Sequence, residues 1–205
     1  MSEDELRAAY EERIHLLEAL AETLEREVKR HLEDVPHIDR IAFRAKTLTS
    51  FLEKANRKRD RYVSPLDEIE DQVAGRVIVF YRDEVEPVQI QLTELFGPVE
   101  EAQHEPEDVS SFSYESFHSI VVIPPALTPG GWVDMDRRPT TCEIQIRTLF
   151  QHAYAESEHD LVYKPPLQLE REEQRKLAWV AASAWGADEV LGQAKTSIYE
   201  RMGTS

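Results

Sequence analysis

The first thirty residues carry apolar side chains at three- and four-residue steps. This stripe begins at Leu6 and runs to Val28 among Glu, Arg and Lys residues. Such a period places the apolar side chains on one face of a helix. We therefore predict one or two amphipathic helices over residues 3–33, ended by Pro36, that pack on a domain or on a partner helix.

The middle of the chain alternates between strand-like and helix-like patterns. Apolar runs rich in β-branched and aromatic residues predict strands over residues 38–45, 73–81, 116–124 and 141–147. Helical periods predict helices from about Thr47, over 85–96, from Leu149 to about Tyr163, and over 168–202 as one helix or a pair. Residues 104–113 are polar and have no period, so we predict a loop there. The order of elements favours an α+β fold, close to α/β, with a mixed β-sheet of four to five strands flanked by helices.

The length of 205 residues fits one domain with helical extensions. We predict an N-terminal helical extension (1–36), a central domain (37–164) and a C-terminal helical extension (165–205). Apolar runs are too short for a membrane span and the start is acidic, so we expect a cytoplasmic protein. Cys142 is the only cysteine, which excludes an internal disulfide and a cysteine zinc site.

The chain is strongly acidic, with a formal net charge of −16. Such a surface repels phosphate backbones at short range, so we do not expect broad nucleic-acid binding. The basic residues nevertheless cluster, because Lys46 and Lys54 are followed closely by Arg57, Lys58, Arg59 and Arg61. This cluster is the first place to expect an anionic ligand, although a solvated helix face would have the same composition.

The predicted strand 141–147 has two chemically different faces, because side chains alternate along a strand. One face is apolar and carries Cys142, Ile144 and Ile146. The other carries a carboxylate, an amide and a guanidinium in a row, those of Glu143, Gln145 and Arg147. Such a face can bind a polar substrate, but a sheet with one solvated face would show the same alternation.

Lys46, Ser50 and Lys54 are spaced by four residues. A helix through them places all three on one stripe, away from the apolar side chains. Two ammonium groups with a hydroxyl between them, near a helix N-terminus, suit a polyphosphate chain. An exposed polar helix face is the alternative.

Asp71 comes just before a buried strand and Arg76 lies within that strand. A carboxylate at a strand end can bind Mg²⁺, which takes one or two carboxylates together with phosphate oxygens. Asp71 and Glu143 are therefore candidates for a two-carboxylate site. The alternative is an Asp71 that forms a salt bridge with Arg76.

Tyr114, Ser116 and His118 share a face at a period of two residues. A tyrosine ring can stack on a nucleobase, and a histidine can hydrogen-bond a phosphate or a ribose. Glu156 and His159 have the i, i+3 spacing of di-iron helical proteins, but the second such pair that this architecture needs is absent. We therefore expect no metal site on that helix.

Together these segments resemble the synthetase domain of the RelA/SpoT family, and in particular the single-domain small alarmone synthetases. The resemblance covers roughly residues 38–164. It rests on Arg44-x-Lys46-x3-Ser50-x3-Lys54, Asp71-x4-Arg76, Tyr114-x-Ser116-x-His118, and Glu143-Ile144-Gln145-Ile146-Arg147-Thr148 followed by Ala155-x2-Glu158-His159. It implies a nucleotidyltransferase-like synthetase domain.

The resemblance also implies an activity, the transfer of the β,γ-pyrophosphate of ATP to the ribose 3′-hydroxyl of GDP or GTP, with release of AMP. ATP would be bound by Arg44, Lys46, Ser50, Lys54 and Arg76, with Arg44 beside the adenine. The acceptor would be bound by Tyr114, His118, Gln145 and Arg147, with Tyr114 stacked on its base. Asp71 and Glu143 would be the catalytic residues and the ligands of a Mg²⁺ cofactor, and Glu143 would bind the metal or help to deprotonate the hydroxyl.

The acceptor half departs from the family pattern. The family commonly reads Gly-Tyr-Arg-Ser-x-His where this chain has Ser-Tyr-Glu-Ser-Phe-His over residues 113–118, and the preceding loop is acidic instead of lysine-rich. The glycine near Asp71 is also displaced, to Gly75, with Ala74 in the expected place. The donor half keeps the family pattern more closely than the acceptor half does.

Three functions remain open from the sequence. The first is synthesis of a (p)ppGpp-type alarmone. The second is a toxin-type relative that acts on the 3′ end of tRNA or on an adenine nucleotide. The altered acceptor segment favours this function, whereas the net charge disfavours tRNA as the substrate. The third is a non-catalytic binding module, which does not require both carboxylates. The terminal helices resemble those that build homo-oligomers in small synthetases, so we expect a homo-oligomer or an antitoxin-type protein partner.

Overall fold

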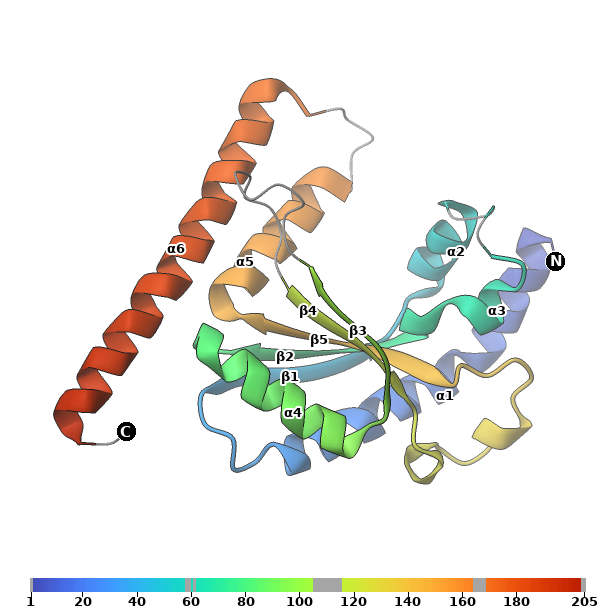
Figure 1. The fold of residues 1–205 in the computed structure, drawn as a ribbon. Helices are drawn as coiled ribbons and strands as arrows, with labels where there is room; N and C mark the ends of the chain where they lie inside the picture. Colours follow the sequence, from blue (N-terminus) through green and yellow to red (C-terminus); the bar gives the residue numbers. More distant parts are fainter. Residues whose placement is uncertain (1, 58–59, 61, 105–115, 164–168, 204–205) are drawn as a thin grey trace.

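The computed structural model describes residues 2–57, 60, 62–104, 116–163 and 169–203 (Figure 1). Within them, five strands form one mixed sheet in the order β1-β2-β5-β4-β3. The strands are β1 (Ile38–Ala45), β2 (Val73–Val79), β3 (Pro98–His104), β4 (Ser116–Val122) and β5 (Thr141–Thr148). β2 and β5 run parallel, and the other neighbouring strands are antiparallel. The predicted α+β fold with a mixed, helix-flanked sheet is confirmed.

One face of the sheet packs against α1 (Glu3–His31) and α4 (Val85–Leu95) to form the core. The predicted apolar stripe of α1 is buried there, including Leu17, Leu20 and Leu24 at 0 % exposure. Ser2 caps the helix, because its hydroxyl accepts from the Glu5 amide while the Glu5 carboxylate accepts from the Ser2 amide. Burial of most of this stripe makes α1 a helical layer that packs on the sheet.

The opposite face of the sheet is covered only in part. Figure 1 shows α2 (Leu48–Arg57) and α3 (Pro65–Glu68) near one end of it and α5 (Leu149–Glu158) near the other. A π-helical turn, His159–Tyr163, follows α5, and the single long helix α6 (Arg171–Met202) packs on α5. The part of this face between α2 and α5 is where the polar side of β5 lies.

The C-terminal half of α6 is held against the rest of the protein by polar contacts. The hydroxyl of Thr148, the residue that caps α5, donates to the buried carboxylate of Asp188 at 2.7 Å. The Lys195 ammonium contacts Glu84 at 2.5 Å and Asp83 at 2.9 Å. These contacts fix α6 to the end of β5 and to the 3₁₀ turn Arg82–Glu84 that follows β2. None of the described helices combines the length and apolar character that a membrane crossing requires.

Several predicted boundaries are corrected by the structure. β3 was not predicted, because the glutamates within Pro98–His104 leave this edge strand without an apolar face. β2 ends at Val79 instead of residue 81, since the next amide, that of Phe80, donates to the His37 carbonyl outside the ladder. β4 ends at Val122 instead of residue 124. The short α3 and the 3₁₀ turn Glu70–Gln72 were also missed. Most of the loop predicted over 104–113 lies outside the described residues, and the three-part domain division stays a prediction.

Candidate active site

β5 supplies the centre of the site. Alternation buries one set of its side chains in the core, as predicted, those of Cys142, Ile144 and Ile146. On the other face a row of hydrogen bonds links the polar side chains. Gln145 Nε2 donates to Glu143 Oε1 at 3.0 Å, and Arg147 Nη2 donates to Gln145 Oε1 at 2.5 Å. The row holds the Glu143 carboxylate in a fixed orientation.

Glu143 is strongly held in its ionised form. His118, on the neighbouring strand β4, places Nδ1 2.5 Å from the same oxygen, Oε1. Burial by itself would raise the pKa of Glu143, but the hydrogen bonds from His118 and Gln145 and the nearby positive charge of Lys54 lower that pKa to about 2. Both contacts use Oε1, and neither uses Oε2.

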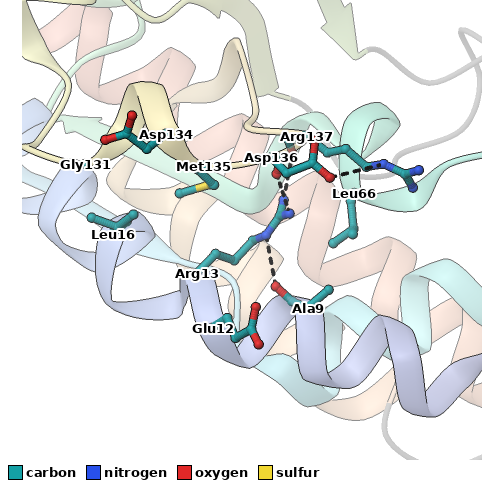
Figure 2. Close-up of a pocket in the computed structure, with 10 residues that line it drawn as sticks. All are labelled: Ala9, Glu12, Arg13, Leu16, Leu66, Gly131, Asp134, Met135, Asp136 and Arg137. Atoms are coloured by element: carbon teal, nitrogen blue, oxygen red, sulfur yellow. Dashed lines mark hydrogen bonds and ion pairs between the residues drawn. The ribbon is translucent and has the colours of Figure 1, made fainter.

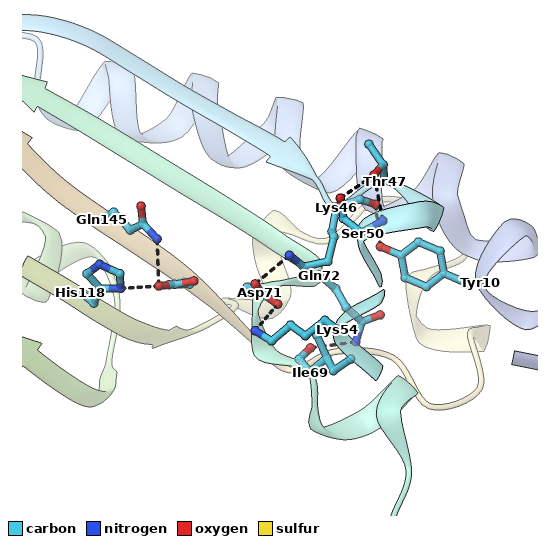
Figure 3. A network of polar contacts seen from close by, with 11 residues as sticks. Tyr10, Lys46, Thr47, Ser50, Lys54, Ile69, Asp71, Gln72, His118 and Gln145 are labelled. Carbon is cyan, nitrogen blue, oxygen red and sulfur yellow. Dashed lines mark hydrogen bonds and ion pairs between the residues drawn. The ribbon is translucent and has the colours of Figure 1, made fainter. Parts of the chain in front are cut away.

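Asp71 lies between the two predicted phosphate-binding lysines (Figure 3). Its Oδ2 is 2.9 Å from Lys46 Nζ and its Oδ1 is 3.0 Å from Lys54 Nζ. All three side chains are between 15 and 21 % exposed. The alternative of a salt bridge between Asp71 and Arg76 is wrong, because Arg76 instead contacts Glu156 at 2.6 Å.

Two buried side chains from outside the motifs position this cluster. The hydroxyl of Tyr10, on α1, donates to the Lys46 carbonyl at 2.8 Å, and its ring stacks on Phe51 of α2. Gln72 is fully buried and donates to the Leu66 and Ile69 carbonyls, which fixes the turn that carries Asp71. Lys46 itself precedes α2, so its position depends on these contacts and not on helical periodicity.

A cavity of about 160 Å³ joins the two halves of the site. The predicted residues that line it are Arg44, Lys46, Ser50, Asp71, Arg76, Glu143 and Gln145. Lys54 is attached to this group through its contact with Asp71. The Ser50 hydroxyl accepts from Thr47, whose own oxygen accepts from the Ser50 amide at the start of α2. Three parts of the sequence, residues 42–54, 71–76 and 143–145, therefore meet at one cavity.

The displaced glycine has a packing cause. A Cβ on Gly75 would lie 2.4 Å from ring atoms of Phe43, so the core needs glycine at this position. The preceding residue, Ala74, is paired with Glu143 across the parallel ladder and lines the cavity. The methyl group of Ala74 thus forms part of the site wall, while Gly75 serves the core.

The acceptor half is described only in part. His118, Gln145 and Arg147 lie on the same face of β4 and β5 as Glu143, and His118 is paired with Gln145 across the ladder. Tyr114 lies outside the described residues, as do Glu115 and most of the acidic segment before it. Within the described part, His118 reaches the Glu143 carboxylate directly, which connects the acceptor strand to the centre of the site.

Comparison with known proteins identifies the family. Residues 43–167 match the family model described as a region found in RelA / SpoT proteins. The chain belongs to the RelA/SpoT family. This RelA/SpoT chain is 29 % identical over 173 residues to GTP pyrophosphokinase YjbM of Bacillus subtilis, covering 82 % of the chain and 77 % of that relative.

Solved structures share the fold of this RelA/SpoT protein. A GTP pyrophosphokinase family protein from Streptococcus pneumoniae has a TM-score of 0.74 at 24 % identity, with 94 % of this chain and 95 % of that chain covered. Small alarmone synthetase 1 from Bacillus subtilis, bound to its product pppGpp, has a TM-score of 0.75 at 23 % identity, with 92 % and 97 % covered. The same synthetase bound to AMPCPP has a TM-score of 0.67 at 23 % identity, with 93 % and 98 % covered.

A larger cavity, of about 570 Å³, shares no lining residue with the site cavity (Figure 2). It is formed between α1 and the segment 131–137. The Arg13 guanidinium at its wall donates to the carbonyls of Asp136 and Arg137 at 2.9 and 2.8 Å, so it fastens this segment to α1. None of the predicted site residues that the structure describes lines it, and size alone therefore does not locate the chemistry of this RelA/SpoT protein.

Sequence reasoning missed Gln72 and two further contributors to the RelA/SpoT site. Tyr10 falls within the predicted apolar stripe of α1, and a tyrosine among leucines is the one sequence signal of its polar contact. Glu156 was considered only as a metal ligand on its helix. The structure places its carboxylate beside Arg76 and Arg147, two of the predicted site residues.

Proposed function

We propose that this protein transfers the β,γ-pyrophosphate of ATP to the 3′-hydroxyl of GDP or GTP and releases AMP. The observation that carries the proposal is the arrangement of Asp71 between two lysines at a cavity that Glu143 also lines. The relative named GTP pyrophosphokinase, and the synthetase structures with pppGpp and AMPCPP, support the same substrates.

The residues of the cavity fit a magnesium ion. Asp71 and Glu143 both line it, Glu143 is ionised, and its Oε2 is not used by His118 or Gln145. These two carboxylates would bind Mg²⁺ together with phosphate oxygens, since this cation takes one or two carboxylates beside a phosphate chain. When bound, Mg²⁺ supplies charge neutralisation for the phosphates.

The donor side of the cavity would bind ATP. Lys46, Lys54 and the Ser50 hydroxyl hold the phosphates, and Arg44 and Arg76 flank the rest of the nucleotide. In the reaction the acceptor 3′-hydroxyl gives its proton to water and its oxygen forms a bond to the β-phosphorus of ATP, while the bond from that phosphorus to the α,β-bridging oxygen breaks. AMP then leaves with that oxygen. Fixed cations and correct placement are the main contributions that a protein makes to such a transfer.

The acceptor side would be formed by His118, Gln145 and Arg147, with Tyr114 expected to stack on the base. Glu143 has a pKa of about 2 and is therefore a weak base. We infer that its main role is to hold the cation and to orient the acceptor hydroxyl through the row of hydrogen bonds on β5. His118, which contacts Glu143 at 2.5 Å, keeps that carboxylate in place.

The alternative acceptor is the 3′ end of tRNA or an adenine nucleotide. Glu115 and the acidic stretch from Glu105 to Asp108 stand where basic residues would meet the phosphates of a guanine nucleotide. The net charge of −16 opposes tRNA, so the guanine nucleotide is the first candidate.

The test is a transfer assay with Mg²⁺ and ATP labelled in its terminal phosphates. GDP, GTP, an adenine nucleotide or deacylated tRNA is added in parallel, and AMP and labelled product are followed. We expect labelled guanine nucleotide, whereas labelled tRNA or adenine nucleotide would establish the alternative acceptor. If no AMP forms with any of these acceptors, the proposal is refuted.

Glu143→Gln and Asp71→Asn are expected to abolish turnover in this assay. The matched control is Glu70→Gln, which removes the same charge from an exposed neighbour of Asp71. Full activity in both site variants would show that the site is wrongly assigned, even if the wild-type protein makes the expected product.

We also propose that the protein self-associates through its terminal helices. α6 exposes a series of large apolar side chains, including Trp179 at 73 %, Val190 at 66 % and Met202 at 66 %. Exposed apolar surface on this scale is typical of a binding face. Light scattering after size exclusion should give an oligomer for the wild-type protein and a smaller species for Trp179→Glu; a monomeric wild-type protein would leave an antitoxin-type partner as the candidate for this face.

A further inference from the structure

Glu156 is a carboxylate that connects two arginines of the site, Arg76 and Arg147. It lies on α5, which turns back over the sheet after β5, and it reaches across 80 residues of sequence to Arg76 on β2. Its Oε1 is 2.6 Å from Arg76 Nη1 and 3.8 Å from Arg147 Nη1. The Glu156 side chain is 50 % exposed, whereas that of Arg147 is only 7 % exposed.

The contact with Arg76 does little for the stability of the fold. Ion pairs at exposed or half-exposed positions contribute about 0–1 kcal/mol to the free energy of unfolding. Its effect on the site is larger, because Arg76 lines the cavity and its long side chain has many rotamers. A contact at 2.6 Å to a helix that is itself packed on α6 keeps the guanidinium at the cavity wall before a ligand arrives.

Glu156 also approaches the row of hydrogen bonds on β5. Arg147 donates to Gln145, and Gln145 donates to Glu143. The same carboxylate oxygen therefore contacts Arg76, on the donor side, and the first member of the row that ends at Glu143. Glu156 itself does not line the cavity, so its contact with the site is through these arginines.

We propose that Glu156 is a positioning residue for ATP. Its carboxylate fixes the guanidinium of Arg76 in the orientation that binds ATP. Fixing this side chain in advance removes part of the entropy that binding would otherwise cost. The identity of the ligand rests on the proposed function, while the role of Glu156 rests on the geometry. The negative charge of Glu156 also repels the phosphates, but solvent screens a half-exposed charge, so the positioning effect dominates.

Three variants separate positioning from charge. Glu156→Ala removes both the carboxylate and the contact. Glu156→Gln removes the charge and keeps a side-chain oxygen that can accept from Arg76. Arg76→Ala removes the group that Glu156 is inferred to position, and the double variant measures whether the two residues act together. Glu172→Ala is the matched control, because Glu172 forms an exposed ion pair with Lys176 at 2.8 Å on α6.

The experiment measures the dissociation constant for ATP by calorimetry in the presence of Mg²⁺. We expect Glu156→Ala to bind ATP roughly tenfold more weakly and Glu156→Gln to stay within about threefold of the wild-type protein. In the Arg76→Ala background, Glu156→Ala should have no further effect. In the transfer assay Glu156→Ala alone should raise KM for ATP and leave kcat within about threefold of the wild-type value.

Two results would overturn the inference. One is an Ala variant that binds ATP as tightly as the wild-type protein or more tightly. The other is a loss of affinity that persists in the Arg76→Ala background. Melting temperatures of Glu156→Ala and Glu172→Ala should both stay near that of the wild-type protein, which excludes unfolding as the cause. A wild-type protein that binds ATP but forms no AMP would refute the proposed function and leave this comparison valid.

Discussion

Replacing Asp71 with asparagine should change stability and ligand binding in opposite directions. The Asp71 carboxylate contacts Lys46 at 2.9 Å and Lys54 at 3.0 Å, and no side chain of the three is more than 21 % exposed. Asparagine keeps the shape and removes the charge. The two ammonium groups then lie near each other without the carboxylate that neutralises them.

The magnitude follows from the distances. At 3 Å and an effective dielectric constant near 20, each pair has a Coulomb energy of about 5 kcal/mol, most of which the lost hydration offsets. Surface pairs contribute about 0–1 kcal/mol, and removal of one partner from a buried pair costs about 3–5 kcal/mol. The Asp71 cluster lies between these limits. We expect Asp71→Asn to lower the free energy of unfolding by about 2–4 kcal/mol.

The same change should improve the binding of ATP without metal. In the wild-type protein, phosphate oxygens have to replace Asp71 at both lysines, because Asp71 itself lines the cavity. In Asp71→Asn this competition is absent, and we expect the dissociation constant for ATP in EDTA to fall by roughly tenfold. Because ligand binding stabilises the folded state, ATP should also restore much of the lost stability.

The assay is urea unfolding with and without ATP in EDTA, together with calorimetric titration of ATP. Glu70→Gln serves as the control and should change neither quantity. An Asp71→Asn variant with unchanged stability and unchanged ATP affinity would refute the reasoning. Weaker ATP binding would also refute it, since it would mean that Asp71 orients the lysines for phosphate and does not compete with it.

The remaining expectations concern three other groups. Tyr10→Phe removes the hydrogen bond to the Lys46 carbonyl but keeps the ring stack, so urea unfolding should show a loss of about 1 kcal/mol and the KM for ATP should rise. Asp188→Ala removes the buried acceptor of the Thr148 hydroxyl and should cost about 1–3 kcal/mol in the same measurement. Glu143 has a folded pKa of about 2, below its ordinary value of 4.5, so its contribution to stability is complete above the ordinary value and is lost as pH falls toward 2. This contribution is about 3 kcal/mol, and the stability difference between the wild-type protein and Glu143→Gln should shrink between pH 6 and pH 3.

Each of these expectations has a contrary result. A Tyr10→Phe variant as unstable as Tyr10→Ala would show that the ring stack is disturbed as well as the hydrogen bond. No change in Asp188→Ala would mean that α6 is not held at Thr148. A stability difference for Glu143→Gln that is constant with pH would contradict the low pKa of Glu143.

Much of the fold follows from the sequence because its signals are local. Period-two alternation and helical periodicity depend only on neighbouring residues, so four strands and the main helices could be predicted. β3 could not, because an edge strand with glutamates lacks an apolar face. Lys46 lies outside α2, and its place is set by a carbonyl contact with Tyr10, 36 residues earlier. No periodic pattern contains that information.

The site was predictable to the same extent. Alternation on β5 assigns Glu143, Gln145 and Arg147 to one face without reference to any other part of the chain. The partner of Asp71 was not predictable, since a carboxylate near an arginine in sequence suggests a local salt bridge. The actual partners of Asp71 are Lys46 and Lys54, from the segment that follows β1. The partner of Arg76 follows from strand order: β2 and β5 are parallel neighbours, which places Arg76 opposite Gln145 and within reach of Glu156 on the helix after β5.

Two carboxylates neutralise cations of this site, and their positions give them different roles. Asp71 lines the cavity, so it occupies the lysines that a phosphate would use, and its removal should favour metal-free ATP. Glu156 lies outside the cavity lining and holds Arg76 from the solvent side, so its removal should weaken ATP binding. In a chain with a net charge of −16, a polyanionic substrate gains little from long-range attraction. Binding then depends on whether phosphate replaces Asp71 at the lysines and on whether Glu156 keeps its contact with Arg76. Opposite effects of the two substitutions on ATP affinity would distinguish a competing carboxylate from a positioning one.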